Sequence, residues 1–265
     1  MDNQPEHKNT SFTLPDKAQL MRLDKYIASC TGMTRKDVKK ALKKSPAFVA
    51  GEKVSAPETQ VDIKTKVVFM GEHLHYSEFT YILMNKAAGY VCTNRAGRNP
   101  TVFSLLGDDV KAKELFTVGR LDKDTTGLLL ITNDGDFSHR MIHAKKHVDK
   151  TYYLTVDTPI PVEAVEKFKI GVDIGDDEPT KPATLEILTE TSANLTICEG
   201  RFHQVKRMME TVDCTVTTLK RLSIGPFTLD ESLAEGEYRF FNDREMEFVK
   251  KRSPDFRTPN VHFLP

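Results

Sequence analysis

The sequence predicts an α+β protein in two parts: a small basic N-terminal module and a larger domain built on a mixed, mainly antiparallel sheet with flanking helices. Short runs rich in β-branched and aromatic residues, bounded by turn residues, recur from residue 81 to residue 197. Only a few segments between them have a helical period, a mixture that is typical of the α+β class. A shift to strongly basic composition before residue 70 sets the N-terminal module apart.

The N-terminal module is predicted to contain two short helices. After a polar tail over residues 1–20, Leu23 and Tyr26 have the spacing of one helix face. A second helix begins after Thr34, which together with Asp37 forms a capping box. The rest of the module is predicted as a hairpin, a strand and a linker, at residues 48–54, 61–70 and 71–79.

The second predicted helix carries basic side chains on the face opposite its apolar residues. Residues 21–70 contain eleven Lys and Arg against five Asp and Glu, whereas the whole chain balances 38 basic with 38 acidic residues. Nucleic-acid phosphate is the natural partner of so basic a surface, and a solvated lysine face without a partner is the alternative. We predict that this module binds RNA or DNA through Arg22, Lys25, Arg35, Lys36, Lys39 and Lys40.

The larger domain is predicted over residues 80–245, with a C-terminal tail over residues 246–265 that is charged and rich in proline. Its strands are predicted at residues 81–86, 116–118, 128–131, 152–156, 183–187 and 194–197. Its helices are predicted at residues 101–106, 137–144, 162–170 and 202–210.

Residues 119–127 form the most informative segment of this domain. They place Asp122 and Asp124 among cations and between glycines, at the junction of two strand-like apolar runs. The neighbouring Arg120 and Lys123 favour an ionised carboxylate, which suits a nucleophile. A charged hairpin loop with a surface ion pair has the same pattern, and spacing alone leaves both interpretations open.

The predicted helix at residues 202–210 is a second candidate site. Its apolar residues fall on one face, and His203, Lys206 and Arg207 lie off that face near its start, directly after a glycine. Cations at the first turn of a helix can bind an anion. An ordinary amphipathic helix is the alternative.

Three histidines, His139, His143 and His147, have a spacing that could place them on one helix face. We predict no metal site there, because three ligands along one helix span too far for a tetrahedral ion. The four cysteines contain no Cys-x-x-Cys pair, which argues against both a zinc knuckle and a disulfide framework. The first residues contain no apolar signal core and no run of about 18 apolar residues occurs, so we predict a cytoplasmic protein without a membrane partner.

A longer pattern resembles a known family. Gly-Arg-Leu-Asp-Lys-Asp-Thr-Thr-Gly-Leu-Leu-Leu-Ile-Thr-Asn-Asp-Gly, at residues 119–135, resembles the signature of the RsuA/RluB/RluE/RluF family of bacterial rRNA pseudouridine synthases. Met-Arg-Leu-Asp-Lys-Tyr-Ile-Ala, at residues 21–28, resembles the opening of the S-four-like (alpha-L) RNA-binding domain that precedes the catalytic domain in this family. Further family motifs are similar to residues 84–91, 150–152 and 199–208, in the same order.

The resemblance implies roles for single residues. The nucleophilic aspartate of the family falls on Asp122, its pocket tyrosine on Tyr152, and its active-site basic residue, which would pair with Asp122, on Lys206. Asp124 would then order the loop. Arg120, His203 and Arg207 are expected to bind the RNA substrate, with Arg207 also the alternative to Lys206.

The implied reaction needs neither a cofactor nor a metal, because it exchanges an N-glycosidic bond for a C–C bond without net redox change or hydrolysis. The resemblance also implies an S-four-like domain over residues 21–75 and a monomeric enzyme that acts on rRNA. His-Gln-Val-Lys-Arg at residues 203–207 and Thr-Lys-Pro-Ala at residues 180–183 favour the small-subunit branch, and therefore one uridine of 16S rRNA, free or in an assembling subunit. A 23S rRNA target is the alternative, followed by a noncatalytic rRNA-binding or ribosome-assembly factor.

Overall fold

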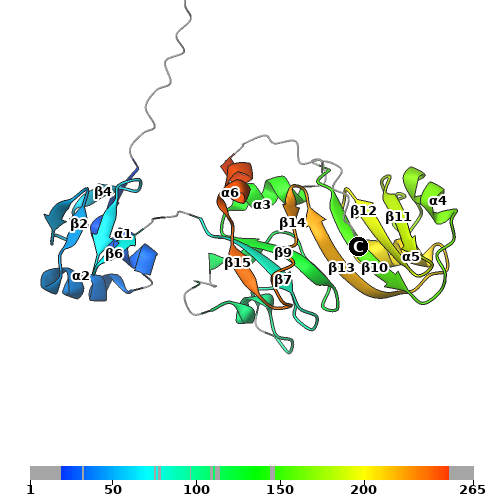
Figure 1. The fold of residues 1–265 in the computed structure, drawn as a ribbon, viewed down its shortest axis with the longest axis horizontal. Coiled ribbons are helices and arrows are strands. Elements are labelled where there is room, and N and C mark those ends of the chain that lie inside the picture. Colours follow the sequence, from blue (N-terminus) through cyan, green and yellow to red (C-terminus); the bar gives the residue numbers. More distant parts are fainter. Residues whose placement is uncertain are drawn as a thin grey trace, which may run out of the picture. The chain divides into compact units, whose positions relative to one another are not determined.

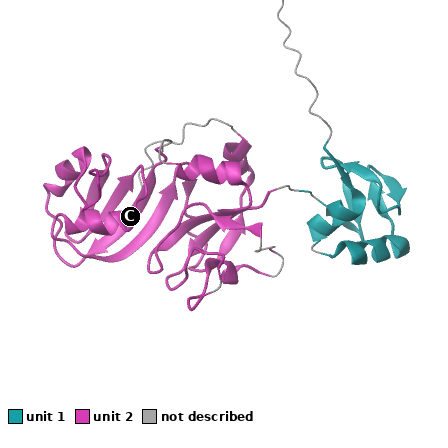
Figure 2. Ribbon diagram, turned by 180° about the vertical axis from the view of Figure 1, so that it is seen from behind, with its two compact units in different colours: residues 1–78 teal, residues 79–265 magenta. Residues whose placement is uncertain are grey.

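The computed structural model describes residues 19–31, 33–74, 76, 79–95, 97–107, 110, 114–143 and 147–250. The chain divides into two compact units, residues 1–78 and residues 79–265, coloured teal and magenta in Figure 2. The predicted N-terminal tail up to residue 18 and the predicted C-terminal tail after residue 250 lie outside the described residues.

The N-terminal unit combines two helices, α1 (Leu23–Thr31) and α2 (Arg35–Lys44), with short antiparallel strands (Figure 1). Thr34 caps α2 as predicted, because its hydroxyl oxygen accepts a hydrogen bond from the Asp37 backbone N–H at 3.2 Å. One strand pair joins β1 to β4, and the other four strands follow the order β3-β2-β5-β6. The strands are β1 (Leu20–Arg22), β2 (Ala47–Val49), β3 (Glu52–Val54), β4 (Gln60–Asp62), β5 (Val67–Phe69) and β6 (Glu72–Leu74).

Two predictions for this unit are wrong. The single strand predicted at residues 61–70 is two strands, β4 and β5, separated by a turn. The predicted linker at residues 71–79 contains β6, which pairs with β5 through a hairpin turn at Met70 and Gly71. Both turn residues have positive φ, 53° and 88°, and a methionine in that conformation gives no turn signal in the sequence.

Within the described residues, nine strands of the second unit form one sheet (Figure 1). Its central order is β11-β12-β10-β13-β9-β7-β15, with β8 added on β9 and β14 added on β13. Every pair is antiparallel except β9 with β13, which confirms the predicted mixed, mainly antiparallel sheet. The strands are β7 (Tyr81–Lys86), β8 (Phe116–Thr117), β9 (Thr126–Thr132), β10 (Lys150–Val156), β11 (Thr184–Thr189), β12 (Ser192–Ile197), β13 (Val216–Ile224), β14 (Phe227–Thr228) and β15 (Tyr238–Phe240).

Strands β7 and β9 are buried on both faces. Side chains alternate along a strand, so Ile82 and Met84 join one apolar cluster, whereas Tyr81 and Leu83 join another on the opposite face. The first cluster includes side chains of α4 and α5, and the second includes side chains of α3 and α6. The helices of this unit are η1 (Val102–Leu105), α3 (Gly135–Ile142), α4 (Ala164–Ile170), α5 (Gln204–Glu210) and α6 (Asp243–Lys250).

Several elements of this unit differ from the prediction, among them α6 and the strands after residue 197, β13, β14 and β15. Helix α6 replaces the first part of the irregular tail predicted from residue 246, because Val249 packs into the second cluster and the Glu245 carboxylate accepts hydrogen bonds from Arg239 and from the Asn242 backbone. Strand β13 lies in the middle of the sheet and is absent from the predicted strands, because Lys220 and Arg221 interrupt its apolar pattern.

Candidate active site

The loop that carries Asp122 connects β8 to β9. The side chain of Lys86 holds this loop through hydrogen bonds to its backbone. Lys86 is fully buried, and its Nζ donates hydrogen bonds to the carbonyl oxygens of Ala87, Lys123 and Thr125 at 3.0, 3.2 and 2.7 Å. Burial lowers the pKa of Lys86. The Gly89 backbone N–H also donates to Lys123 O, at 2.8 Å. Several backbone atoms on both sides of Asp124 are therefore held in place.

The loop ends at Gly127, where two strands approach closely. Gly127 has a φ of 93° and pairs with Arg221 in the parallel register of β9 and β13. A Cβ atom at this position would lie 2.8 Å from the Arg221 backbone nitrogen and closer still to its carbonyl oxygen. Only glycine fits both the backbone conformation and the contact.

An open hollow beside the loop brings together predicted residues from three segments. It has an empty volume of about 470 Å³, and its lining includes Arg120, Asp122, Tyr152, His203 and Lys206. Polar groups that converge beside an aromatic side chain are typical of ligand sites. The surface-hairpin interpretation of the loop does not account for this convergence.

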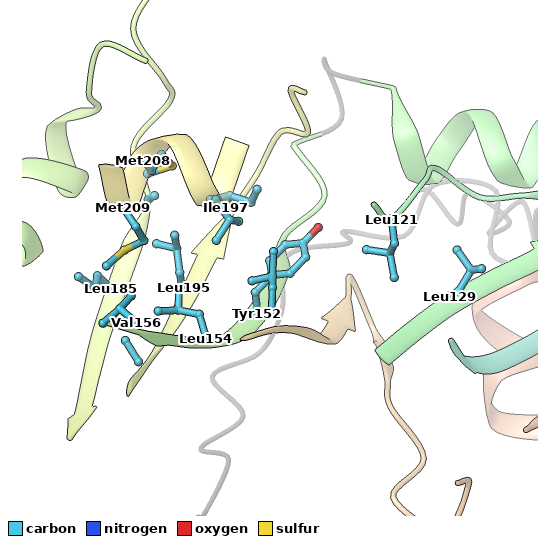
Figure 3. Close-up of a cluster of buried hydrophobic side chains, with 14 of the residues drawn as sticks. Leu121, Leu129, Tyr152, Leu154, Val156, Leu185, Leu195, Ile197, Met208 and Met209 are labelled. Carbon is cyan, nitrogen blue, oxygen red and sulfur yellow. The ribbon is translucent and has the colours of Figure 1, made fainter. Parts of the chain in front are cut away.

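Tyr152 forms the apolar side of this hollow. It lies on β10 at the edge of the large apolar cluster and is only 8% exposed, with its hydroxyl pointing away from Leu154 and Leu195 (Figure 3). An aromatic ring held by packing on one side can stack on a planar ligand on the other.

Asp122 contacts His203 across the hollow. Asp122 Oδ1 lies 3.4 Å from His203 Nε2, and the Asp122 side chain is 31% exposed. The carboxylate is therefore accessible from the hollow while its position is restrained by a ring nitrogen of the residue that caps α5.

Lys206 pairs with the other aspartate of the loop. Its Nζ donates to Asp124 Oδ2 at 2.6 Å, so the predicted pairing of Lys206 with Asp122 is wrong for this structure. The hydrogen bond from Lys206 lowers the pKa of Asp124. The contact ties the loop to α5 across 82 positions of sequence, which spacing cannot reveal.

Arg207, the predicted alternative to Lys206, does not line the hollow. Its Nη2 contacts Asp176 Oδ1 at 2.6 Å and the Ile174 carbonyl oxygen, and its Nη1 donates to the Phe202 carbonyl oxygen at 3.1 Å. Arg207 therefore holds the turn before α5, and of the two basic residues only Lys206 lines the hollow.

Comparisons with known proteins give the family of the chain. Residues 80–211 match the family model described as RNA pseudouridylate synthase. "Ribosomal small subunit pseudouridine synthase A" of Haemophilus influenzae is 43% identical over 233 residues, which cover 87% of this chain and 100% of the relative.

The chain belongs to the RNA pseudouridine synthase family.

This pseudouridine synthase is also 41% identical to "Uncharacterized RNA pseudouridine synthase YtzG" of Bacillus subtilis, over 87% of the chain and 99% of the relative. A solved structure titled "Crystal structure of pseudouridylate synthase" is 42% identical, with a TM-score of 0.62, and the match covers 86% of this chain and 98% of the other. The matches extend over most of the chain, so the family resemblance of the sequence motifs is confirmed.

The RNA-binding residues predicted in the N-terminal unit fall into two groups. Arg22, Arg35 and Lys39 converge on Asp24, which is fully buried, with N–O distances of 3.1, 2.9 and 3.7 Å. Burial opposes ionisation of Asp24, but hydrogen bonds from Arg22 and Arg35 outweigh it and lower the pKa of the carboxyl. Lys25, Lys36 and Lys40 are exposed and make no hydrogen bond or ion pair within the part of the chain that the structure describes.

Three buried cations of the second unit are missing from the predicted residues: Lys86, Lys150 and Arg221. Lys150 Nζ donates to the Val148 carbonyl oxygen at 2.6 Å, and Arg221 Nε donates to the Leu128 carbonyl oxygen at 2.8 Å. Burial lowers the pKa of Lys150 to about 8. Within the described residues none of the three pairs with a carboxylate, so together they make the potential near the site more positive. Lys86 ends β7, Lys150 begins β10 and Arg221 lies within β13, and no local sequence pattern shows that these cations are buried.

The predicted histidine series does not share a helix. His139 lies in α3, His143 follows it, and His147 has a φ of 48° and lies 3.2 Å from Lys181 Nζ through Nδ1. Among the described residues, no group of three or more His, Cys, Asp and Glu is placed to hold a metal ion. The helices in the described ranges are all too short or too polar to span a bilayer.

Proposed function

We propose that this enzyme isomerises one uridine of 16S rRNA to pseudouridine, with Asp122 as the nucleophile. The observation that carries the proposal is the convergence of Asp122, Tyr152 and Lys206 in the lining of one hollow. The name of the Haemophilus influenzae relative supports a target in the small ribosomal subunit. No resident cofactor is part of the proposal, because the reaction only rearranges bonds of the substrate.

The reaction begins when the target uridine leaves the RNA stack and enters the hollow, at a cost of a few kcal/mol. Tyr152 stacks on the uracil, and Asp122 acts on the ribose, either by attack on C1′ or by removal of the C2′ proton. The C1′–N1 bond breaks, the uracil turns, and a C1′–C5 bond forms while the Asp122–C1′ bond breaks or, on the second route, the proton returns from Asp122 to C2′. The proton on C5 is then lost and N1 gains a proton, so atoms and charge balance.

Lys206 and His203 have separate roles in this proposal. His203 holds the Asp122 carboxylate from one side. Lys206 orders the loop through Asp124 and adds positive charge at the wall of the hollow, where negative charge develops on the released uracil.

Chemical mapping of pseudouridine in 16S and 23S rRNA from a strain that lacks this protein tests the target. We expect a single 16S pseudouridine to disappear and to return when the wild-type gene is restored. Loss of a 23S pseudouridine instead would overturn the 16S assignment. Unchanged rRNA, together with no conversion of rRNA fragments in a single-turnover assay, would favour a noncatalytic assembly factor.

Substitution of each partner in the Lys206–Asp124 pair separates loop ordering from charge stabilisation. Lys206→Gln is expected to lower the single-turnover rate on the order of 10²-fold, because it removes a charge that lines the hollow. Asp124→Asn is expected to cost about 10-fold or less, because the pair is exposed and only orders the loop. Single-turnover rates of the two variants at saturating RNA show whether Lys206 acts by its charge or only by ordering the loop. Equal losses in the two variants would show that Lys206 acts only through Asp124.

We also propose that the N-terminal unit is an S-four-like domain that holds the rRNA near the catalytic unit. Lys36 and Lys40 are exposed on α2 and have no protein partner among the described residues, so they are free to contact phosphates. The cations that neutralise Asp24 instead stabilise the fold of the unit.

The double variant Lys36→Gln/Lys40→Gln is expected to weaken binding of an rRNA fragment. Each phosphate contact with single-stranded RNA contributes about 0.7 to the slope of the logarithm of the association constant against the logarithm of the salt concentration. Loss of two contacts should therefore make this slope shallower by about 1.4. Filter binding at several salt concentrations measures this slope. Lys53→Gln/Lys66→Gln removes the same charge from the same unit outside α2 and is the matched control. Equal slopes for the two double variants would contradict the role of α2.

A further inference from the structure

Phe202 is an exposed aromatic residue beside the catalytic hollow, and the proposed mechanism does not use it. Its side chain is 74% exposed. The ring stacks on His203, with centroids 3.8 Å apart and planes at 17°. His203 in turn contacts Asp122, so Phe202 is the outer member of a short series that begins at the proposed nucleophile. Its other face has no ring contact within the described residues.

The turn that carries Phe202 is firmly held. The Arg201 backbone N–H donates to Gln204 Oε1 at 3.0 Å, and Arg207 Nη1 donates to the Phe202 carbonyl oxygen at 3.1 Å. His203 adopts a left-handed conformation with a φ of 50°, which turns the chain sharply into α5. An aromatic ring on a fixed turn binds a partner with little loss of conformational entropy.

Phe202 also lines a second, wider hollow that continues from the catalytic one. This groove has an empty volume of about 1700 Å³ and shares Arg120, Asp122 and His203 with the catalytic hollow. Its apolar lining includes Val91, Phe116 and Ile142. The groove is therefore continuous with the site of the target uridine.

The charge of the groove suits a nucleic acid strand. Arg120 is exposed and makes no hydrogen bond or ion pair within the described residues, so its guanidinium can contact a phosphate. Arg201 is already occupied by the carbonyl oxygens of Glu178 and Pro179. A free cation next to an exposed aromatic ring is the combination that binds single-stranded nucleotides.

We propose that Phe202 stacks on the base of a nucleotide adjacent to the target uridine and so positions the RNA strand for the reaction. When the uridine leaves the stack, the base next to it loses a stacking partner. The free face of the Phe202 ring then takes the place of the uridine against that base. This inference rests on the proposed function. It identifies Phe202 as a substrate-positioning residue, distinct from the residues that act on the reacting atoms.

The test uses the full-length enzyme and a short RNA that wild-type enzyme converts, with 2-aminopurine replacing either neighbour of the target. Phe202→Ala and Phe202→Leu are expected to weaken RNA binding by roughly 5- to 100-fold, the range for loss of one base–aromatic stack. Phe202→Tyr keeps the ring and is expected to bind as wild type. One of the two 2-aminopurine positions should change fluorescence with wild type and Phe202→Tyr but not with Phe202→Ala or Phe202→Leu.

Phe240→Ala is the matched control, because Phe240 is 51% exposed in the same unit and lines neither hollow. Wild-type affinity and fluorescence in Phe202→Ala would overturn the inference while leaving the proposed function intact. An effect of Phe202→Ala on assembled small-subunit particles but not on the RNA would also overturn it, in favour of a protein contact. Failure of wild type to convert any rRNA would instead refute the proposed function, and this inference with it.

Discussion

Asp122→Asn is expected to abolish pseudouridine formation while leaving RNA affinity nearly unchanged. The loss in single-turnover rate should be on the order of 10⁴-fold or more, as for other removed nucleophiles. Asparagine has the same shape as aspartate but cannot attack the ribose or remove a proton. The loop is held by Lys86 and Gly89 through its backbone, so the substitution leaves these contacts in place.

Asp124→Asn makes the same chemical change two residues further along the loop and is the matched control. It should cost about 10-fold or less in rate, because Asp124 is 70% exposed and bonded to Lys206 rather than facing the hollow. Rapid-quench assays on a radiolabelled fragment give the rate, and filter binding gives the affinity. Activity near wild type in Asp122→Asn would refute the assignment of the nucleophile. A loss of affinity that matches the loss of rate would place Asp122 in RNA binding instead.

The strands that could be predicted from the sequence are those whose burial has a simple pattern. Strand β7 is buried along its whole length and appears as a continuous apolar run with a polar end, so its bounds match the prediction at residues 81–86. Strand β13 could not be found, since Arg221 lies buried within it and resembles a surface residue in the sequence. Strand β6 was hidden because the turn before it uses Met70 at positive φ.

The site could be predicted only in part. The composition of the loop at residues 119–127 indicated a functional carboxylate, but the roles of Tyr152 and Lys206 followed from family resemblance and not from spacing. Their convergence depends on the antiparallel pairing of β10 and β13 and on the position of α5, which are long-range contacts. The pairing of Lys206 with Asp124, and the support of the loop by Lys86, depend on side-chain directions that no local pattern encodes.

Gly127→Ala is expected to destabilise the catalytic unit and to displace the Asp122 loop. The new methyl group would collide with the backbone of Arg221, at the one place where β9 and β13 pair in parallel. The new Cβ is fixed by its own backbone and meets backbone atoms of Arg221, so a change of rotamer cannot relieve the clash, and the strands must separate. We expect a loss on the order of 2–4 kcal/mol in the free energy of unfolding, together with a large loss of activity.

Gly236→Ala is the control that separates the cost of the left-handed backbone conformation from the cost of the backbone clash in Gly127→Ala. Gly236 has a φ of 92°, close to that of Gly127, but a Cβ atom there meets only side-chain carbons at 3.8 Å or more. This control carries the cost of the left-handed backbone alone, about 1 kcal/mol. Urea unfolding and single-turnover rates of the two variants give the comparison. A Gly127→Ala variant no less stable than Gly236→Ala would mean that the strands separate freely and that the Asp122 loop does not depend on their contact. If Gly127→Ala is less stable than Gly236→Ala and inactive, the close contact of the β9 and β13 backbones at Gly127 positions Asp122.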